Sequence, residues 1–246
     1  MRNRTDAIFA LIAVNAVFYV ITHLVPGMEN RMIEIFALYF PKNENFEWWQ
    51  FVTNMFMHGG IMHILFNMYA LWAFGSPLEV MWGKQRFLLF YFLCGIGASV
   101  IYTLVNYYQF NNIYNELINM GVSVSDIEKL LRTGTYEDSL IPEAFKSSVS
   151  TFYYLYRNPA VGASGAIYGV LVAFAILFPN AKLALIFLPV PIAAKYFIPI
   201  LIALDLFSGI TGMSIFGGGI AHFAHIGGAI IGFLLMWYWR KTVPAQ

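Results

Sequence analysis

Residues 86–108 read RFLLFYFLCGIGASVIYTLVNYY, and Arg86 at their start is their one charged residue. A run of about 20 apolar residues can cross the hydrocarbon core of a bilayer as an α-helix. Across the 246 residues, 59% are hydrophobic and 11% are charged, whereas soluble globular domains carry about 25% charged residues. We therefore expect a membrane protein, because lipid requires no polar covering.

Further apolar stretches of this kind predict an all-α membrane protein with six transmembrane helices. The predicted spans are residues 7–25, 61–80, 86–108, 161–178, 195–210 and 222–239. The stretch 183–191 is also apolar, but it contains prolines and is too short to cross. The first run follows Arg2 and Arg4 as a signal peptide would. No small-residue cleavage site follows it, so we expect a retained span.

Charge placement predicts the orientation of the chain in the membrane. With an even number of spans, both termini and the short charged loops lie on one side. The basic residues on that side are Arg2, Arg4, Lys84, Arg86, Lys182, Lys195, Arg240 and Lys241. Because Lys and Arg in short loops mark the cytoplasmic side, we expect cytoplasmic N- and C-termini in an integral multi-pass protein.

The outer loops differ in composition. Residues 26–60 form a long first loop whose Trp48 and Trp49 suit the membrane interface. Residues 109–160 form a polar insertion between spans three and four, with helical patterning at 124–131 and Ser125 as its candidate cap. Residues 208–221 are uncharged and rich in glycine. They suit either a mobile lid over a site or a plain connector.

Charge and cysteine content limit the partners. The net charge of +1 provides no basic field for nucleic acid. The single cysteine, Cys94, rules out an intrachain disulfide. We expect a lipid bilayer around the chain, no nucleic acid partner and no cofactor.

Three polar clusters lie at the predicted outer ends of spans two, four and six. The first contains His58, His63 and Asn67, and the last two share a helix face. The second is Gly162-Ala-Ser164-Gly165 followed by Tyr168 and Gly169, and the third is His222-Phe-Ala-His225 followed by Gly228 and Gly232. Each cluster alone is more typical of helix packing than of chemistry. Together they place a hydroxyl, an imidazole and an amide at one depth, as acyl transfer requires.

The three clusters, in this order, closely resemble the rhomboid family of intramembrane serine proteases. The family motifs H-x-x-x-x-H-x-x-x-N, G-x-S-G and A-H-x-x-G-x-x-x-G are present as His58 to Asn67, Gly162 to Gly165 and Ala224 to Gly232. The resemblance covers almost the whole chain. It implies a six-span rhomboid-like bundle in a bacterial inner membrane. It also implies that the protein cleaves transmembrane segments of other membrane proteins.

The resemblance also implies roles for residues of the site. Ser164 would be the nucleophile and His225 the general base. The Ser164 backbone amide, His63 and Asn67 would form the oxyanion hole. Tyr168 would be the aromatic residue that stacks on the base, and His58 would be a structural histidine. Gly165, Gly228 and Gly232 would form the seam at which the helices approach closely.

Other features limit the resemblance or leave its details open. Glu79 matches an acidic residue of the family at the inner end of span two. Gln50 stands where the family has arginine in the first loop, which puts the hydrogen bonding of that loop in doubt. Asp205 lies within span five, and we expect it to be a hydrogen-bonded packing residue rather than a partner of the base.

Three alternative functions remain open on sequence alone. One is an inactive rhomboid-like protein that binds membrane clients. A second is a metal-dependent membrane protein that uses the histidines, although no H-E-x-x-H motif is present and we expect no metal. The third is a channel or transporter, which would need polar residues along the span interiors.

Overall fold

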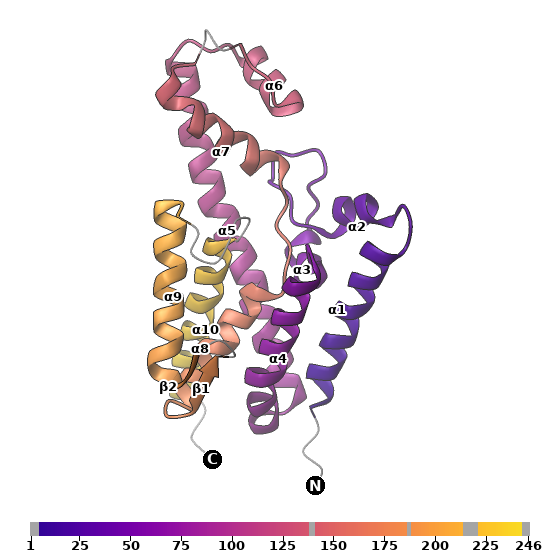
Figure 1. Cartoon of the computed structure of the whole chain (residues 1–246), viewed down its shortest axis with the longest axis vertical. Coiled ribbons are helices and arrows are strands. Elements are labelled where there is room, and N and C mark those ends of the chain that lie inside the picture. Colours follow the sequence, from indigo (N-terminus) through magenta and orange to yellow (C-terminus); the bar gives the residue numbers. More distant parts are fainter. Residues whose placement is uncertain (1–4, 138–140, 186–187, 214–220, 243–246) are drawn as a thin grey trace.

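Long helices dominate the computed structural model, which describes residues 5–137, 141–185, 188–213 and 221–242 (Figure 1). All six predicted spans are helical. They correspond to α1 (Asp6–Leu24), α4 (Ile61–Trp82), α5 (Lys84–Asn119), α8 (Ser164–Leu177), α9 (Ala194–Thr211) and α10 (His222–Thr242). The predicted fold class, an all-α membrane bundle, is confirmed.

Membrane residence follows from the length and hydropathy of these helices. Within the described residues, four helices are long and apolar enough to cross a bilayer: α1, α4, α5 and α9. Helix α8 is apolar but has only 14 residues. At 1.5 Å per residue it is about 21 Å long, which is shorter than the roughly 30 Å hydrocarbon core. One end of α8 must therefore lie below a membrane surface.

The start of α1 and the end of α10 lie at the same end of the bundle (Figure 1). Helices α4, α8 and α10 all begin at the opposite end, where Ile61, Ser164 and His222 are their first residues. We call this opposite end the site end.

Helix α5 continues far beyond its predicted end at residue 108. Its 36 residues span about 54 Å, more than the membrane thickness requires. Its upper part extends past the other helices and carries α6 (Val124–Thr133) and α7 (Lys146–Arg157) (Figure 1). The 109–160 insertion is thus a helical extension built on α5, with a short 3₁₀ turn, η3 (Glu143–Phe145).

This extension has a hydrophobic cluster of its own. Its buried members come from α5, α6, α7 and the loop between α1 and α4, and include Phe40, Phe110, Leu117, Ile127, Leu130 and Phe152. Ser123, not Ser125, caps α6 by accepting a hydrogen bond from the Asp126 amide. The predicted cap was wrong because the helix begins at Val124, which makes Ser125 the second residue of the helix.

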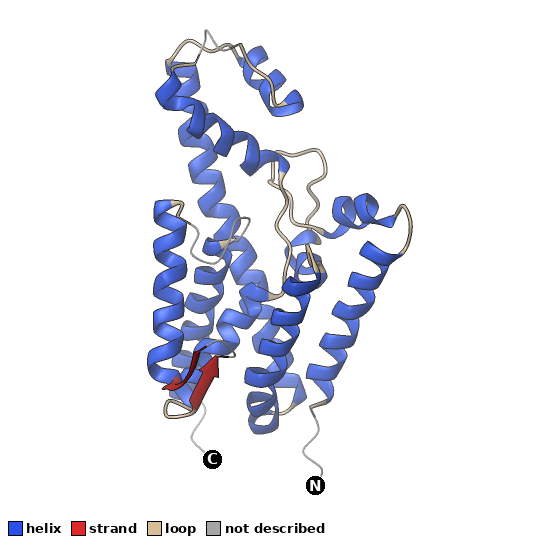
Figure 2. Cartoon of the chain, viewed as in Figure 1, coloured by secondary structure: helices blue, strands red, loops and turns tan. Residues whose placement is uncertain are grey.

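A two-stranded hairpin at the end of the bundle opposite the site end is the one sheet among the described residues (Figure 2). Strands β1 (Lys182–Leu185) and β2 (Leu188–Ala193) pair antiparallel, with Lys182 opposite Ala193. The stretch 183–191 was predicted only to be too short to span. Its prolines are compatible with a strand because both strands of a two-stranded sheet are edges.

The loop between α1 and α4 contains three short helices: α2 (Met28–Phe36), α3 (Gln50–Thr53) and the 3₁₀ turn η1 (Asn54–Phe56). Gln50 is fully buried and bonds to loop backbone on three sides. Its amide nitrogen donates to the carbonyls of Glu34 (3.2 Å) and Asn45 (2.7 Å), and its carbonyl accepts from the Tyr39 amide (3.1 Å). Gln50 therefore holds this loop together without arginine.

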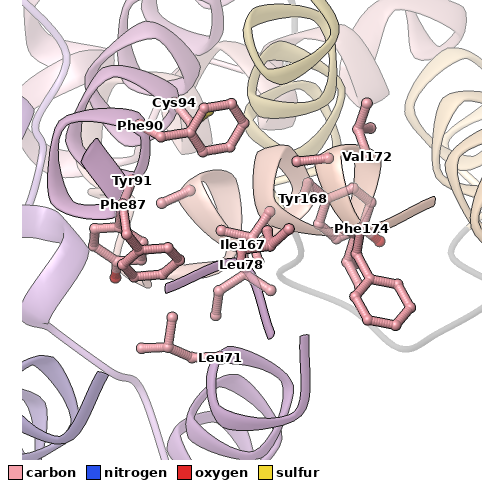
Figure 3. Packing of buried hydrophobic residues seen from close by; sticks show 14 of the residues in the cluster. Leu71, Leu78, Phe87, Phe90, Tyr91, Cys94, Ile167, Tyr168, Val172 and Phe174 are labelled. Carbon is pink, nitrogen blue, oxygen red and sulfur yellow. The ribbon is translucent and has the colours of Figure 1, made fainter. Parts of the chain in front are cut away.

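Helix α8 is the centre of the bundle and packs against α4, α5, α9 and α10. Every residue from Gly165 to Phe174 is buried. The surrounding core contains Leu71 and Leu78 from α4 and the aromatic side chains of α5, with Tyr168 and Phe174 from α8 (Figure 3). Such packing on all sides fixes the position of Ser164 at the start of α8.

Glycines bring α8 and α10 into backbone contact. A Cβ atom on Gly228 would lie 1.8 Å from the carbonyl oxygen of Gly165, and one on Gly232 would lie 2.6 Å from the Cα of Gly169. Both distances are far below van der Waals contact. The small-residue seam predicted from the sequence is therefore present, and it sets the spacing of the two helices.

Two further features concern positions that the sequence had marked. The Glu79 carboxylate accepts the Ala7 amide (2.7 Å) and the Ile8 amide (3.0 Å), which caps the N-terminus of α1. Residues 208–211, predicted to belong to a lid or connector, instead form the last turn of α9. The rest of that prediction falls largely on residues 214–220, which lie outside the described residues.

Candidate active site

Ser164 and His225 meet between the first turns of α8 and α10. The Ser164 Oγ lies 2.7 Å from the His225 Nε2, which is hydrogen-bond distance. The His225 side chain is only 12% exposed. The two residues are 61 positions apart in the chain, and the glycine seam below them lets their helices approach closely enough for this contact.

Tyr168 lies one turn below Ser164 and supports the imidazole. The rings of Tyr168 and His225 stack with centroids 4.2 Å apart and an interplanar angle of 13°. Tyr168 is largely buried, so its ring is held by the core of the bundle. The stack limits rotation of the His225 ring and keeps its Nε2 aimed at the hydroxyl.

Asp205 contacts the other side of the same imidazole, which differs from the sequence prediction. Its carboxylate Oδ2 lies 2.9 Å from the His225 Nδ1. The same carboxylate accepts a hydrogen bond from the Tyr168 hydroxyl and contacts the His222 Nδ1. Asp205 was expected to be a hydrogen-bonded packing residue and not a partner of the base. It reaches the base because α9 packs against both α8 and α10 at this level.

These contacts determine which ring nitrogen of His225 carries the proton. A carboxylate can only accept, so the Nδ1 donates to Asp205. The Nε2 is then an acceptor and faces the Ser164 hydroxyl, which donates to it. This protonation pattern is the one in which an imidazole can remove a proton from a serine.

His63 lies next to the nucleophile. A Cβ atom on Gly162 would be 2.9 Å from the His63 Nε2 and 3.6 Å from the Ser164 Oγ. Gly162 has φ 131°, which only glycine adopts readily. Its lack of a side chain leaves room for the His63 ring beside Ser164.

Asn67 is buried one turn further along α4. Its side-chain amide nitrogen donates to the His63 carbonyl at 2.8 Å, so the amide is bonded to its own helix. The Ser164 backbone amide belongs to the first turn of α8, whose amides have no partner within the helix. That helix end also carries a partial positive charge.

His58 is buried behind His63 and has a structural environment. It is 3% exposed, and the two rings pack edge to face with centroids 5.0 Å apart. Burial, together with the nearby His63, lowers the pKa of His58 to about 3. His58 is therefore neutral at physiological pH. Its backbone carbonyl bonds to the His23 Nε2 at 2.8 Å, which joins the site to α1.

A small cavity opens beside Ser164. Its lining includes small side chains and a hydrogen-bonded polar pair, Asn54 and Ser99, whose side chains are 3.1 Å apart. The small lining residues are Gly162, Gly165, Ala166, Ala221 and Ala224, and larger side chains such as Leu38, Met55 and Tyr102 complete the lining.

The described residues contain no group of three or more His, Cys, Asp and Glu side chains arranged to hold a metal ion. Asp205 contacts both His222 and His225, and each of these contacts is a hydrogen bond.

Sequence comparison assigns the chain to a family. The Rhomboid domain family model matches residues 45–125 and 139–242, which together are most of the chain. The protein therefore belongs to the rhomboid family, and it is an integral membrane protein with that family's helical bundle. The residues between the two matched segments include most of α6.

Several curated proteins are similar over much of this chain. Rhomboid protein 1, mitochondrial, from Saccharomyces cerevisiae is 28% identical over 79% of this chain, and the match covers 43% of that protein. Presenilin-associated rhomboid-like protein A, mitochondrial, from Danio rerio is 27% identical over 78% of this chain and 39% of its own length. Rhomboid protease AarA from Providencia stuartii is 28% identical over 92% of this chain and 68% of its own length.

The chain thus spans about two fifths of the length of the two mitochondrial relatives. Two of the similar proteins bear the name rhomboid protease, from Providencia stuartii and Bacillus subtilis. The second of these is 46% identical, but over only 22% of this chain.

Proposed function

We propose that this protein is an intramembrane serine endopeptidase that cleaves transmembrane segments of other membrane proteins. The observation that carries the proposal is the 2.7 Å contact between the Ser164 hydroxyl and the His225 imidazole. A serine hydroxyl is a weak nucleophile on its own, and an adjacent base that accepts its proton activates it. The names of two similar proteins as rhomboid proteases support the same activity.

The reaction proceeds by acyl transfer. The Ser164 Oγ attacks the scissile carbonyl carbon while the His225 Nε2 takes the hydroxyl proton. The tetrahedral intermediate collapses when the imidazolium returns that proton to the leaving amine nitrogen. Water then attacks the acyl carbon while the His225 Nε2 takes one of its protons. The second tetrahedral intermediate collapses as the bond between the acyl carbon and the Ser164 Oγ breaks. The imidazolium returns its proton to that Oγ, and the acyl group leaves as a carboxylic acid.

The oxyanion of the tetrahedral intermediate needs donors in place before it forms. The Ser164 backbone amide at the start of α8 is one donor, and the His63 imidazole beside Gly162 is a second. Asn67 supplies a third after its amide turns away from the His63 carbonyl. Removing one such donor typically lowers kcat by about 10²–10³-fold.

Access to Ser164 selects the substrate. A helical backbone shields its carbonyls in hydrogen bonds, so a transmembrane segment must unwind locally before it is cut. We therefore propose substrates with helix-weakening residues near the end of their span that faces the site. The small side chains that line the cavity beside Ser164 favour a small residue before the cut.

The orientation follows from charge. The short charged loops at the end of the bundle opposite the site contain Lys84, Arg86, Lys182 and Lys195, and this end faces the cytoplasm by the positive-inside rule. We propose that both termini are cytoplasmic, that the membrane is a bacterial inner membrane, and that the site opens to the outer face.

The experiment compares three purified proteins in liposomes: wild type, Ser164→Ala and His225→Ala. Each is incubated with a single-span substrate that carries glycine and small residues near its outer end. We expect wild-type cleavage and loss of cleavage in both variants, with unchanged melting temperatures. Cleavage by Ser164→Ala at the wild-type rate would exclude a serine mechanism. Abolition by a chelator in that case would favour the metal-dependent alternative.

No observation favours the client-binding alternative, since the nucleophile and base are both present and in contact. That alternative predicts substrate binding without cleavage by the wild-type protein in the same liposomes. A channel is not supported either, because α8 is buried among apolar side chains along its length.

A further inference from the structure

Asp205 is the buried carboxylate nearest to the reacting groups, and the dyad mechanism above leaves it unused. Its side chain is 1% exposed, although burying an ionised carboxylate is costly unless it is hydrogen-bonded. Three side chains bond to it: His225, His222 and Tyr168. Of these, His225 is the base, and Tyr168 carries the ring that stacks on it.

The geometry around His225 is that of a base held between two partners. Its Nε2 faces the Ser164 Oγ at 2.7 Å, and its Nδ1 faces the Asp205 Oδ2 at 2.9 Å. A carboxylate in this position fixes the tautomer and orientation of the imidazole. It also stabilises the imidazolium that forms when the serine proton is transferred.

We infer that Asp205 is a positioning residue that completes a Ser164–His225–Asp205 triad within the membrane. Its negative charge stabilises the protonated form of His225 during acyl transfer, and its hydrogen bond keeps the Nε2 unprotonated beforehand. Asp205 does not itself take up the proton. This inference rests on the proposed function, because it assigns a role in the same reaction.

The hydrogen bonds to Asp205 also hold its carboxylate in a fixed position. The Tyr168 hydroxyl bonds to Asp205 while the Tyr168 ring stacks on His225. His222 contacts the remaining carboxylate oxygen from the start of α10. The carboxylate is therefore held by α8 and α10 together. A purely structural carboxylate would need the same bonds but would not need to face the nitrogen opposite the nucleophile.

The central variant is Asp205→Asn, which keeps the shape and removes the charge. Asparagine can still accept one hydrogen bond, but its amide group would face a donor and it cannot stabilise an imidazolium. We expect kcat to fall about 10²–10⁴-fold, the range that general-base assistance contributes, with KM changed less than about threefold because no substrate contact is lost.

Glu79→Gln is the matched control. Glu79 is another buried carboxylate, 2% exposed, whose oxygens accept two hydrogen bonds far from Ser164. Its conversion to the amide lowers stability without touching the base. We expect it to lower the melting temperature and leave kcat, measured below the melting temperature, within about threefold of wild type.

A second arm separates positioning from structure. If Asp205 acts through His225, Asp205→Asn has no further effect on the residual rate of the His225→Ala protein. Asp205→Glu restores the charge on a longer side chain, and we expect its kcat to be at least about tenfold higher than that of Asp205→Asn. All rates are measured below the melting temperature of each variant.

Two results would overturn the inference. One is a kcat for Asp205→Asn within about tenfold of wild type while Ser164→Ala and His225→Ala are inactive. The other is an equal rate loss from Asp205→Asn in the wild-type and His225→Ala backgrounds, which indicates a structural role. If instead Ser164→Ala remains active, the proposed function fails first, so the two failures are distinguishable.

Discussion

A single methyl group on α10 tests whether the glycine seam positions the base. In Gly228→Ala the new Cβ would lie 1.8 Å from the Gly165 carbonyl oxygen and 2.7 Å from its carbonyl carbon. Real Cβ atoms essentially never approach other atoms closer than 3.0 Å. The oxygen contact alone requires a separation of about 1.2 Å, the difference between 3.0 Å and 1.8 Å.

That displacement is large compared with the tolerance of the Ser164–His225 contact. The contact is 2.7 Å long, and hydrogen bonds weaken steeply beyond about 3.2 Å. His225 is on the turn next to Gly228, so an outward shift of α10 by about 1.2 Å breaks the contact. We expect kcat/KM to fall by roughly 10²-fold or more, with overpacking costing about 1–3 kcal/mol in stability.

The assay is cleavage of a fluorogenic transmembrane substrate in liposomes, with the melting temperature measured in parallel. Ile230→Ala is the matched control, because Ile230 is on the same helix, is 46% exposed, and its truncation introduces no clash. We expect the control to retain the wild-type rate. A Gly228→Ala protein with kcat/KM within threefold of wild type would refute the view that this seam sets the position of the base.

Three further predictions concern stability. Glu79→Gln weakens the cap on α1 and is expected to lower the free energy of unfolding by about 1.5–3 kcal/mol; an unchanged melting temperature would contradict this. Gln50→Ala leaves loop backbone groups unpaired and is expected to cost at least about 2 kcal/mol, whereas Gln109→Ala, at an exposed position of α5, should cost under about 0.5 kcal/mol. Because the folded-state pKa of His58 is about 3, below its unfolded value of about 6.5, stability from its neutral form is present above pH 6.5 and is lost as the pH falls toward 3. Between pH 7 and pH 5 the wild type should lose up to about 2 kcal/mol more than His58→Gln, and equal losses in chemical denaturation would contradict the burial of a neutral imidazole.

The helices and the approach of Ser164 to His225 could be predicted from the sequence because they depend on local patterns. Apolar runs define the spans, and glycines four residues apart mark the faces at which helices approach closely. Ser164 lies just above Gly165, and His225 just above Gly228. Once the helices are aligned at the site end, those spacings leave little freedom for the two side chains.

Asp205 was missed for a physical reason. A carboxylate in a short, uncertain span gives no local signal for which neighbour it faces, since that depends on the rotation of α9 against α10. The glycine seams predict how α8 and α10 approach one another but not the rotation of α9. The signal that could have found it is the cost of burying a carboxylate in a membrane together with two histidines three residues apart on the next helix.

The hairpin and the extension also depend on long-range contacts. The prolines in the stretch 183–191 argued against a span but could not indicate that its two halves pair. The continuation of α5 to Asn119 depends on packing of Phe110 and Leu117 against α6 and α7. Polar composition alone predicted a loop there, because the partners of those apolar side chains are distant in the chain, as in the stack of Phe110 on Phe152.

The most direct measurement of the central claim is covalent labelling of Ser164. The wild-type protein in liposomes is treated with a fluorophosphonate, digested and analysed by tandem mass spectrometry, alongside His225→Ala. Because the base in contact with Ser164 activates its hydroxyl, we expect an adduct on Ser164 that forms in the wild type and is lost in the folded His225→Ala protein. An unlabelled Ser164 in a folded wild-type protein that still cleaves its substrate, or equal labelling in both proteins, would contradict a serine activated by His225.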